Sequence, residues 1–527
     1  MTSRALLAYA WALALLAGAA RAAPASPVAP APGEARAAAA GKDARTWRQA
    51  HERAILAEFA RFLALPNVAS DRAGIAANVD TLRALLERRG LAVRVLRQGD
   101  APPLVVADLA VAKGARTIAF YAHYDGQPTD TLSWRGLPWT PVLRSPSGAE
   151  LPLPSGSEPP RGGASDPLPP EARLYARSSG DDKAPIIAML VALDAMRAAK
   201  TRPAFNLRLV FEGEEEAGSP HLAKYMADEP ALLGPDAWLI CDGPVHQSGQ
   251  ALLAFGARGT TSVDLTVYGP VKGLHDGHYG NWVPNPVSLL AHLLATLRDD
   301  EGKPTIPGFL DEVTPPTDAE RSAIHAIPDV EPSLRSEFEI GDTEGGGASL
   351  NETLLEPAIN FRGVKAGNVG ERATNTIPTE ARASIDFRLV PAQTPASVRT
   401  HFEAHLSSLG WTIVADPPDS TARVTHEKIV RLEWGAGYPA ARTPLDAPFS
   451  IEVTRLVTAL GREPVRTPTL GGSVPMYLFQ EPNGTPAIIL PIANHDDNQH
   501  APNENLRLQN LWDGIETFAA LFAGLGK

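Results

Sequence analysis

The chain has 527 residues, a formal net charge of -12, 44% hydrophobic residues and 20% charged residues. This length exceeds the size of one small hydrophobic core, so we expect at least two domains. The acidic balance disfavours nucleic acid and anionic membranes as partners, because both bind basic patches.

The first 22 residues have the pattern of a secretory signal peptide. Arg4 provides a positive start, residues 5–20 are apolar, and Ala20-Arg21-Ala22 resembles a cleavage site. We therefore expect a protein exported to the periplasm or beyond, with no membrane attachment after cleavage. An uncleaved anchor is the alternative, although the apolar run is short for a membrane span. Residues 23–44 are rich in Ala and Pro and are expected to form a disordered leader.

Residues 45–258 alternate between apolar runs typical of buried strands and segments with helical spacing. The expected strands cover residues 92–96, 104–109, 117–122, 207–211 and 236–241. The expected helices cover residues 46–63, 71–90 and 186–199. This alternation predicts an α/β catalytic domain with a doubly wound, mostly parallel sheet. Residues 145–170 are rich in Pro, Gly and Ser, and they are expected to form an irregular insertion.

The pattern changes at Gly259. Strands with alternating polarity are expected over 262–268 and 382–389, and helices over 286–297 and 395–409. This pattern predicts a smaller α+β domain over residues 259–440, inserted into the first domain. Residues 441–527 are then expected to return to the main domain with two helices and one strand.

Three of the expected strands are followed by side chains that can bind a cation. The first leads to His123 and Asp125, the second to Glu215 and Glu216, and the third to Asp242. Open α/β sheets bind ligands at this edge. Clustered carboxylates repel one another unless a cation lies among them or one of them stays protonated. For the glutamate run alone, a solvated acidic turn is the alternative interpretation.

The candidate metal ligands are imidazole and carboxylate groups without a thiolate. They are His123, Asp181, Glu216, Asp242 and His500. These ligand types suit zinc, manganese or cobalt. Five are too many for one catalytic zinc with an open position, but they fit two ions that share a carboxylate. Glu215 can then act as the general base, and Asp125 can orient the His123 imidazole.

These motifs, in this order, resemble the M20 family of di-zinc metallopeptidases (M20/M25/M40). The similarity is greatest to the carnosinase-like dipeptidase and carboxypeptidase branch, over residues 50–525. The motifs that carry it are His123-x-Asp125, Asp181-Asp182-Lys183, Glu212-Gly-x-Glu215-Glu216-x-Gly-Ser and His500-x-x-x-Glu504.

The resemblance implies two divalent metal ions, Zn²⁺ first and Mn²⁺ or Co²⁺ as alternatives. Asp181 would bridge the ions, with His123 and Asp242 completing one site and Glu216 and His500 the other. A cis peptide bond between Asp181 and Asp182 is also implied.

The inserted domain resembles the family's dimerisation or lid domain. By this resemblance His275 would reach the active site of a partner subunit and stabilise the oxyanion of the reaction. Asn375 would hold the substrate's carbonyl, and Arg388 its C-terminal carboxylate through a planar fork. Gly471, Gly472 and Ser473 match a loop that lines the substrate site. The implied assembly is a homodimer formed through the inserted domain.

The resulting prediction is an exported, metal-dependent exopeptidase that hydrolyses dipeptides or short peptides with a free C-terminal carboxylate. A metal-bridging water would attack, with Glu215 as general base. An N-acyl-amino-acid amidohydrolase on the same scaffold is the alternative enzyme. A non-catalytic protein that has kept the fold is a third hypothesis; it predicts a missing ligand or base, and none is missing from the motifs.

Overall fold

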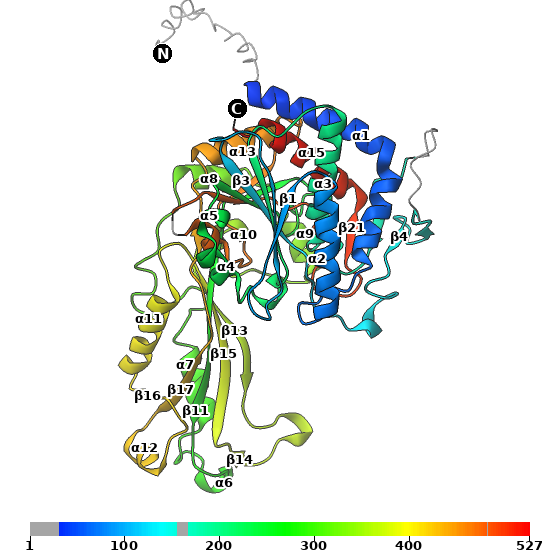
Figure 1. Cartoon of the computed structure of the whole chain (residues 1–527). Coiled ribbons are helices and arrows are strands. Elements are labelled where there is room, and N and C mark those ends of the chain that lie inside the picture. Colours follow the sequence, from blue (N-terminus) through cyan, green and yellow to red (C-terminus); the bar gives the residue numbers. More distant parts are fainter. Residues whose placement is uncertain (1–30, 155–166, 482, 527) are drawn as a thin grey trace, which may run out of the picture.

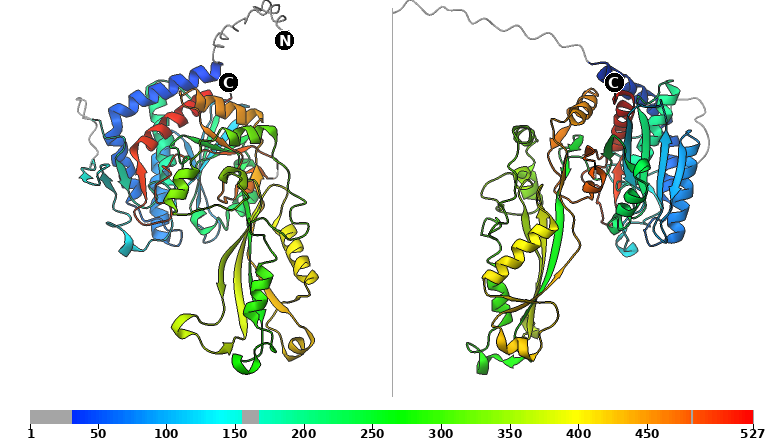
Figure 2. Two further views of the ribbon diagram at one scale, coloured as in Figure 1. Left: turned by 180° about the vertical axis from the view of Figure 1, so that it is seen from behind. Right: turned by 60° about the vertical axis from the view of Figure 1, so that its left-hand side comes forward.

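The computed structural model of the chain describes residues 31–154, 167–481 and 483–526. The predicted signal peptide lies outside these residues, as does the middle of the 145–170 segment. Figure 1 shows a main domain of sheet and helices from which a longer, narrower domain extends, and the second panel of Figure 2 shows the two domains side by side. Within the described ranges, no helix is both long and apolar enough to cross a membrane.

The main domain is built on an eight-stranded mixed sheet. In order across the sheet, its strands are β1 (Ala92–Leu96), β2 (Leu104–Leu109), β7 (Asn206–Glu212), β3 (Thr117–His123), β8 (Ala237–Ile240), β20 (Ala487–Ile489), β9 (Leu252–Ala254) and β19 (Val465–Thr467). The central strands β7, β3, β8 and β20 are parallel, whereas β1 and β2 pair antiparallel at one edge. Parallel neighbours end at the same edge, so the residues after β7, β3 and β8 meet there.

Helices cover both faces of this sheet, which confirms the predicted doubly wound α/β class. In β3, Ile118, Phe120 and Ala122 belong to one core and Ala119 and Tyr121 to the other, because successive strand side chains point to opposite faces. The first face packs against α1 (Pro32–Leu63), α2 (Arg72–Glu87), α3 (Lys183–Ala198), α13 (Pro448–Thr458) and α15 (Leu508–Gly524). The second packs against α4 (Leu222–Asp228), α5 (Pro230–Leu233) and α14 (Met476–Gln480).

Two parts of the main domain differ from the sequence-based expectation. The disordered leader expected over 23–44 is wrong from Pro32 onward, because α1 begins there. Small side chains such as Ala37, Ala40 and Ala44 are buried in the main core, and α1 packs along α15. In the expected irregular insertion, residues 150–151 form a short strand, β5 (Glu150–Leu151). It joins a small sheet with β4 (Val142–Arg144), β6 (Arg173–Tyr175) and β21 (Asn505–Arg507).

The inserted lid domain has a five-stranded sheet with its own core, as predicted. The strand order is β13 (Ala358–Lys365), β15 (Glu380–Leu389), β11 (Gly259–Tyr268), β17 (Ile429–Trp434) and β16 (Thr412–Val414). Its core is formed with α7 (Pro286–Leu294) and α11 (Pro395–Ser408). Shorter helices in this segment are α6 (Asp276–Tyr279), α8 (Asp318–His325), α9 (Glu331–Glu337), α10 (Leu350–Thr353) and α12 (Ser420–Thr425), of which α8 packs against β19 and the core of the main domain. Two small ladders pair β12 (Leu274–His275) with β14 (Thr376–Ile377) and β10 (Gly256–Ala257) with β18 (Ala441–Arg442).

Candidate metal centre

The ends of three neighbouring parallel strands form one wall of the centre. His123 is the last residue of β3, Asp242 follows β8, and Glu216 follows β7 in a short turn. The antiparallel pair β6 and β21 brings two further loops to this edge, one with Asp181 and one with His500. The topology therefore brings all five predicted ligands together.

Asp181 occupies the middle of the cluster. Its Oδ1 lies 2.8 Å from Nε2 of His123, and its Oδ2 lies 3.0 Å from Nε2 of His500. The Asp181–Asp182 peptide bond is cis, as the family resemblance implies. A carboxylate with one histidine at each oxygen has the arrangement needed to bridge two cations.

Two groups of potential ligand atoms surround Asp181. His123, Asp182 and Asp242 form one group; Asp181, Glu216 and His500 form the other, and within each group the ligand atoms lie within 4.8 Å of one another. This matches the predicted division of ligands except for Asp182, which the sequence reasoning did not include. Its Oδ2 accepts the His123 backbone N–H, while Oδ1 is buried without a protein partner among the described residues. The adjacent Asp181 and Asp182 in the sequence were the signal from which this further potential ligand could have been predicted.

The electrostatics of these groups also fit a site for two cations. Burial raises the pKa of Asp242 to about 7, and the negative charge of Asp181 adds to the rise. Burial acts to raise the pKa of Asp181 as well, but hydrogen bonds from His123 and His500 outweigh it and hold that pKa below its ordinary range. The carboxylates cannot all ionise without added positive charge. Oxygen and imidazole donors in two groups fit a pair of divalent metal ions.

Glu215 lies beside the ligands in the turn after β7, as its position next to Glu216 predicts. Burial raises its pKa well above the ordinary value, and the charge of Asp242 is the next cause. The Asp125 carboxylate holds this turn, because its oxygens accept the N–H groups of Glu215 at 3.2 Å and Glu216 at 3.1 Å. The same carboxylate lies 3.3 Å from Nδ1 of His123. Asp125 therefore links the His123 imidazole to the position of Glu215.

The predicted lid residues divide into two groups that lie far apart. His275 and Asn375 are neighbours at the paired strands β12 and β14, where the Asp276 N–H donates to the Asn375 carbonyl at 3.1 Å. Figure 1 shows β14 and α6 at the end of the lid domain that is distant from the main sheet. Arg388 lies at the opposite end of the lid sheet, where its Nη1 donates to Oγ of Ser473 at 2.8 Å.

The loop of Gly471, Gly472 and Ser473 therefore meets Arg388 at the junction of the two domains. Gly471 also approaches the lid, since a Cβ there would lie 3.0 Å from Cδ2 of Leu354. His275 and Asn375 do not join this group within one chain. The His275 side chain is 54% exposed, so another molecule can contact it.

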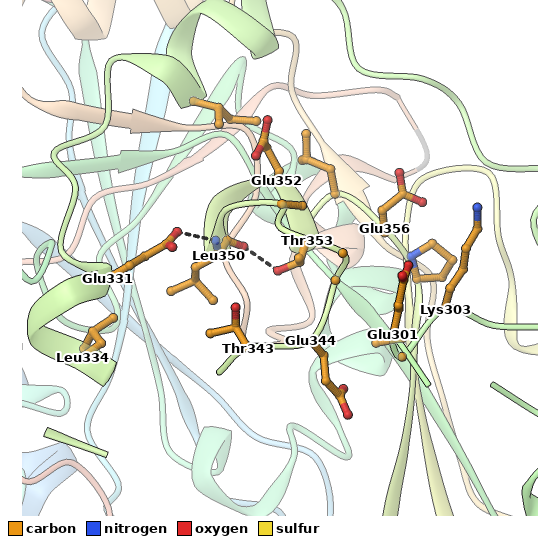
Figure 3. Close-up of a pocket in the computed structure, with 18 of the residues that line it drawn as sticks. Glu301, Lys303, Glu331, Leu334, Thr343, Glu344, Leu350, Glu352, Thr353 and Glu356 are labelled. Atoms are coloured by element: carbon orange, nitrogen blue, oxygen red, sulfur yellow. Dashed lines mark hydrogen bonds between the residues drawn. The ribbon is translucent and has the colours of Figure 1, made fainter. Parts of the chain in front are cut away.

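A large cavity lies elsewhere, in the lid segment between β11 and β13. It has a volume of about 850 Å³ and is lined mostly by residues 301–358, including several glutamates around α10. Figure 3 shows Glu301, Glu331, Glu344 and Glu352 around it. None of the candidate metal ligands lines this cavity, so its size does not mark the centre of the chemistry.

The sheet topology and the two groups of potential metal ligands are those expected of a metallopeptidase of the M20 type. Residues 119–523 match the model of peptidase family M20/M25/M40, and the chain belongs to this family.

Known relatives agree with this assignment. The chain is 26% identical to "Beta-Ala-His dipeptidase" of Rattus norvegicus over 441 residues, which covers 81% of this chain and 80% of the relative. It is 26% identical to "Cys-Gly metallodipeptidase DUG1" of Saccharomyces cerevisiae over 437 residues, with 80% and 81% covered. The M20 metallo-carboxypeptidase Sso-CP2 from Sulfolobus solfataricus has a similar structure, with a TM-score of 0.69, 25% identity and coverage of 88% of this chain and 97% of that one.

Proposed function

We propose that this metallopeptidase hydrolyses dipeptides or short peptides that carry a free C-terminal carboxylate. The observation that carries the proposal is the Asp181 carboxylate, which reaches one histidine at each oxygen with Glu215 beside it. Relatives whose names describe dipeptidases support a dipeptide as the substrate.

His123, Asp182 and Asp242 would hold one divalent ion and Glu216 and His500 the other, with Asp181 between them. When bound, the ions, Zn²⁺ first by ligand type, supply Lewis acidity to the scissile carbonyl and to the attacking water.

Glu215 has the position and the protonation behaviour of a general base. Burial raises its pKa above the ordinary value, which makes the carboxylate a stronger base toward the attacking water, and the proton it takes can then pass to the leaving amine. Arg388 would bind the C-terminal carboxylate, since Asp386 and Ser473 hold its guanidinium at the junction of the domains. His275 and Asn375 would complete the site of a partner subunit in a homodimer.

The test is hydrolysis of a dipeptide panel by chelator-treated protein to which Zn²⁺, Mn²⁺ or Co²⁺ is added back. We expect metal to restore cleavage. The E215Q variant should still bind metal but should lose at least about 100-fold in kcat, because it cannot move the proton. E463Q, which changes an exposed glutamate of the main domain, is the matched control and should behave as wild type.

Each other result has a definite meaning. Protein that binds no metal would refute the ligand assignment, and an E215Q variant with full activity would refute the role of Glu215. Cleavage of N-acyl amino acids with no cleavage of dipeptides would replace the peptidase by a deacylase.

We also propose that the protein is exported, because the first 22 residues have the composition of a signal peptide. Cell fractionation and N-terminal sequencing test this proposal. Full-length protein in the cytoplasmic fraction would refute it.

A further inference from the structure

Tyr438 is held at the junction of the two domains, beside the groups proposed to bind the substrate. Its N–H donates to the Thr260 carbonyl at 2.9 Å, and its carbonyl accepts the Thr260 N–H at 3.0 Å. This exchange of two backbone hydrogen bonds pins Tyr438 against the start of β11. The sequence analysis assigned no role to it.

The strand register places Tyr438 and Arg388 on one face of the sheet. Thr260 pairs directly with Tyr438 on one side and with Arg388 on the other. Side chains of directly opposite residues point to the same face, so Tyr438 and Arg388 flank Thr260 there. Arg388 in turn contacts Ser473.

The ring of Tyr438 forms a wall with a second tyrosine. Tyr438 and Tyr477 of α14 stack with their ring centroids 5.6 Å apart and their planes 17° apart. Both side chains are only half-buried, so part of this aromatic surface remains open. The pKa of Tyr438 is raised to about 12, first by burial and then by the charge of Glu215, while Arg388 opposes the rise. The phenol therefore lies within the electrostatic reach of both groups.

The chemistry of a peptide substrate determines which of its residues would contact the two tyrosine rings. In an α-amino acid, one Cα separates the amino nitrogen from the carboxylate. If Glu215 protonates the leaving amine and Arg388 binds the carboxylate, the C-terminal residue lies between them. Tyr438 flanks Thr260 on the face of the sheet that carries Arg388 and lies within reach of the Glu215 charge, so its ring would face the side chain of that residue.

We propose that Tyr438, supported by Tyr477, is a specificity-determining residue that favours peptides with a large apolar or aromatic C-terminal residue. This inference rests on the proposed peptidase function. Apolar and aromatic side chains gain free energy by covering the open ring surface, whereas glycine gains none and a charged side chain loses hydration.

The test compares kcat/KM for Ala-Phe, Ala-Leu, Ala-Gly and Ala-Asp in the metal-loaded, full-length protein. Wild type should prefer Ala-Phe to Ala-Gly by about tenfold or more, and Y438A should lose most of this preference. Y438F keeps the ring and should keep the preference. The control Y268A removes a half-buried tyrosine at the other end of β11, about 26 Å along the strand, and should not change the ratio.

The ratio of two kcat/KM values is measured on one preparation, so it does not depend on how much of a variant is folded. An unchanged Ala-Phe to Ala-Gly ratio in Y438A, with good dipeptide cleavage, would overturn this inference alone. No preference for Ala-Phe in wild type would also overturn it. A wild-type enzyme that cleaves no dipeptide would overturn the proposed function and this inference together.

Discussion

At the scale of single residues, Glu504 holds the loop that carries the bridging Asp181. Its fully buried carboxylate accepts N–H groups of Ser178 at 2.9 Å, Gly180 at 3.0 Å and Asp181 at 3.1 Å, and pairs with Arg177 at 2.8 Å. E504A would leave the Arg177 charge and three amides unpaired, so we expect a loss of about 3–5 kcal/mol in unfolding free energy. We also expect metal affinity to fall about 10–100-fold. Denaturant unfolding and calorimetric metal titration measure the two effects.

A surface pair provides the control for Glu504. Asp228 pairs with Lys224 at 2.8 Å on an exposed face of α4, so D228A should change stability by less than about 1 kcal/mol and leave metal binding unchanged. If E504A bound metal as tightly as wild type, Glu504 would not be a positioning residue.

At the scale of secondary structure elements, the first turns of α1 belong to the folded core. Ala37, Ala40 and Ala44 are buried, and Arg45 pairs with Glu516 of α15 at 2.6 Å. Removing residues 1–45 should lower the unfolding free energy by at least about 2 kcal/mol, from three buried methyl groups alone. The midpoint of thermal unfolding should then fall by about 2–4 °C. A chain that starts at Pro32 is the control; equal midpoints for the two truncations would show that these turns do not stabilise the fold.

At the scale of the whole molecule, one chain cannot bring every predicted site residue to its own metal centre. β15 has 10 residues and spans about 30 Å between the end near Asn375 and the end with Arg388. In the proposed homodimer, the distant end of one lid domain would reach the centre of the partner subunit.

Mixing two inactive variants tests this assembly. E215Q lacks the base but provides His275, while H275A provides the base but lacks the histidine. When equal amounts of the two variants mix at random, about half of the dimers are mixed, and one of the two sites in each mixed dimer is complete. The mixture should therefore recover about a quarter of wild-type activity per site. A mixture of E215Q with H123A should stay inactive, since each change disables the metal centre of its own subunit and no dimer then has a complete site. No recovery in the first mixture would refute the action of His275 across subunits.

The sequence was most informative where the chemistry follows from local patterns. Apolar runs that end at His123 and near Asp242 predicted buried strands with polar ends, and parallel strands necessarily end at one edge. The alternation of strands and helices predicted the α/β class for a similar reason. Composition was less informative for residues 32–44, because Ala-rich segments occur both in loops and in packed helices. Burial against α15 is what makes this segment a helix of the core.

By itself, the sequence predicted the kinds of ligand and the place of Glu215 beside them, since both depend on short motifs, and it predicted an inserted domain from a change of pattern along the chain. The tertiary structure alone decided the rest. It showed that the Asp182 carboxylate lies within 4.8 Å of the ligand atoms of His123 and Asp242, that Glu504 holds the Asp181 loop, and that Tyr438 faces the same side as Arg388. These relations depend on strand pairing and loop packing between segments far apart in the chain, and no local pattern encodes such distances.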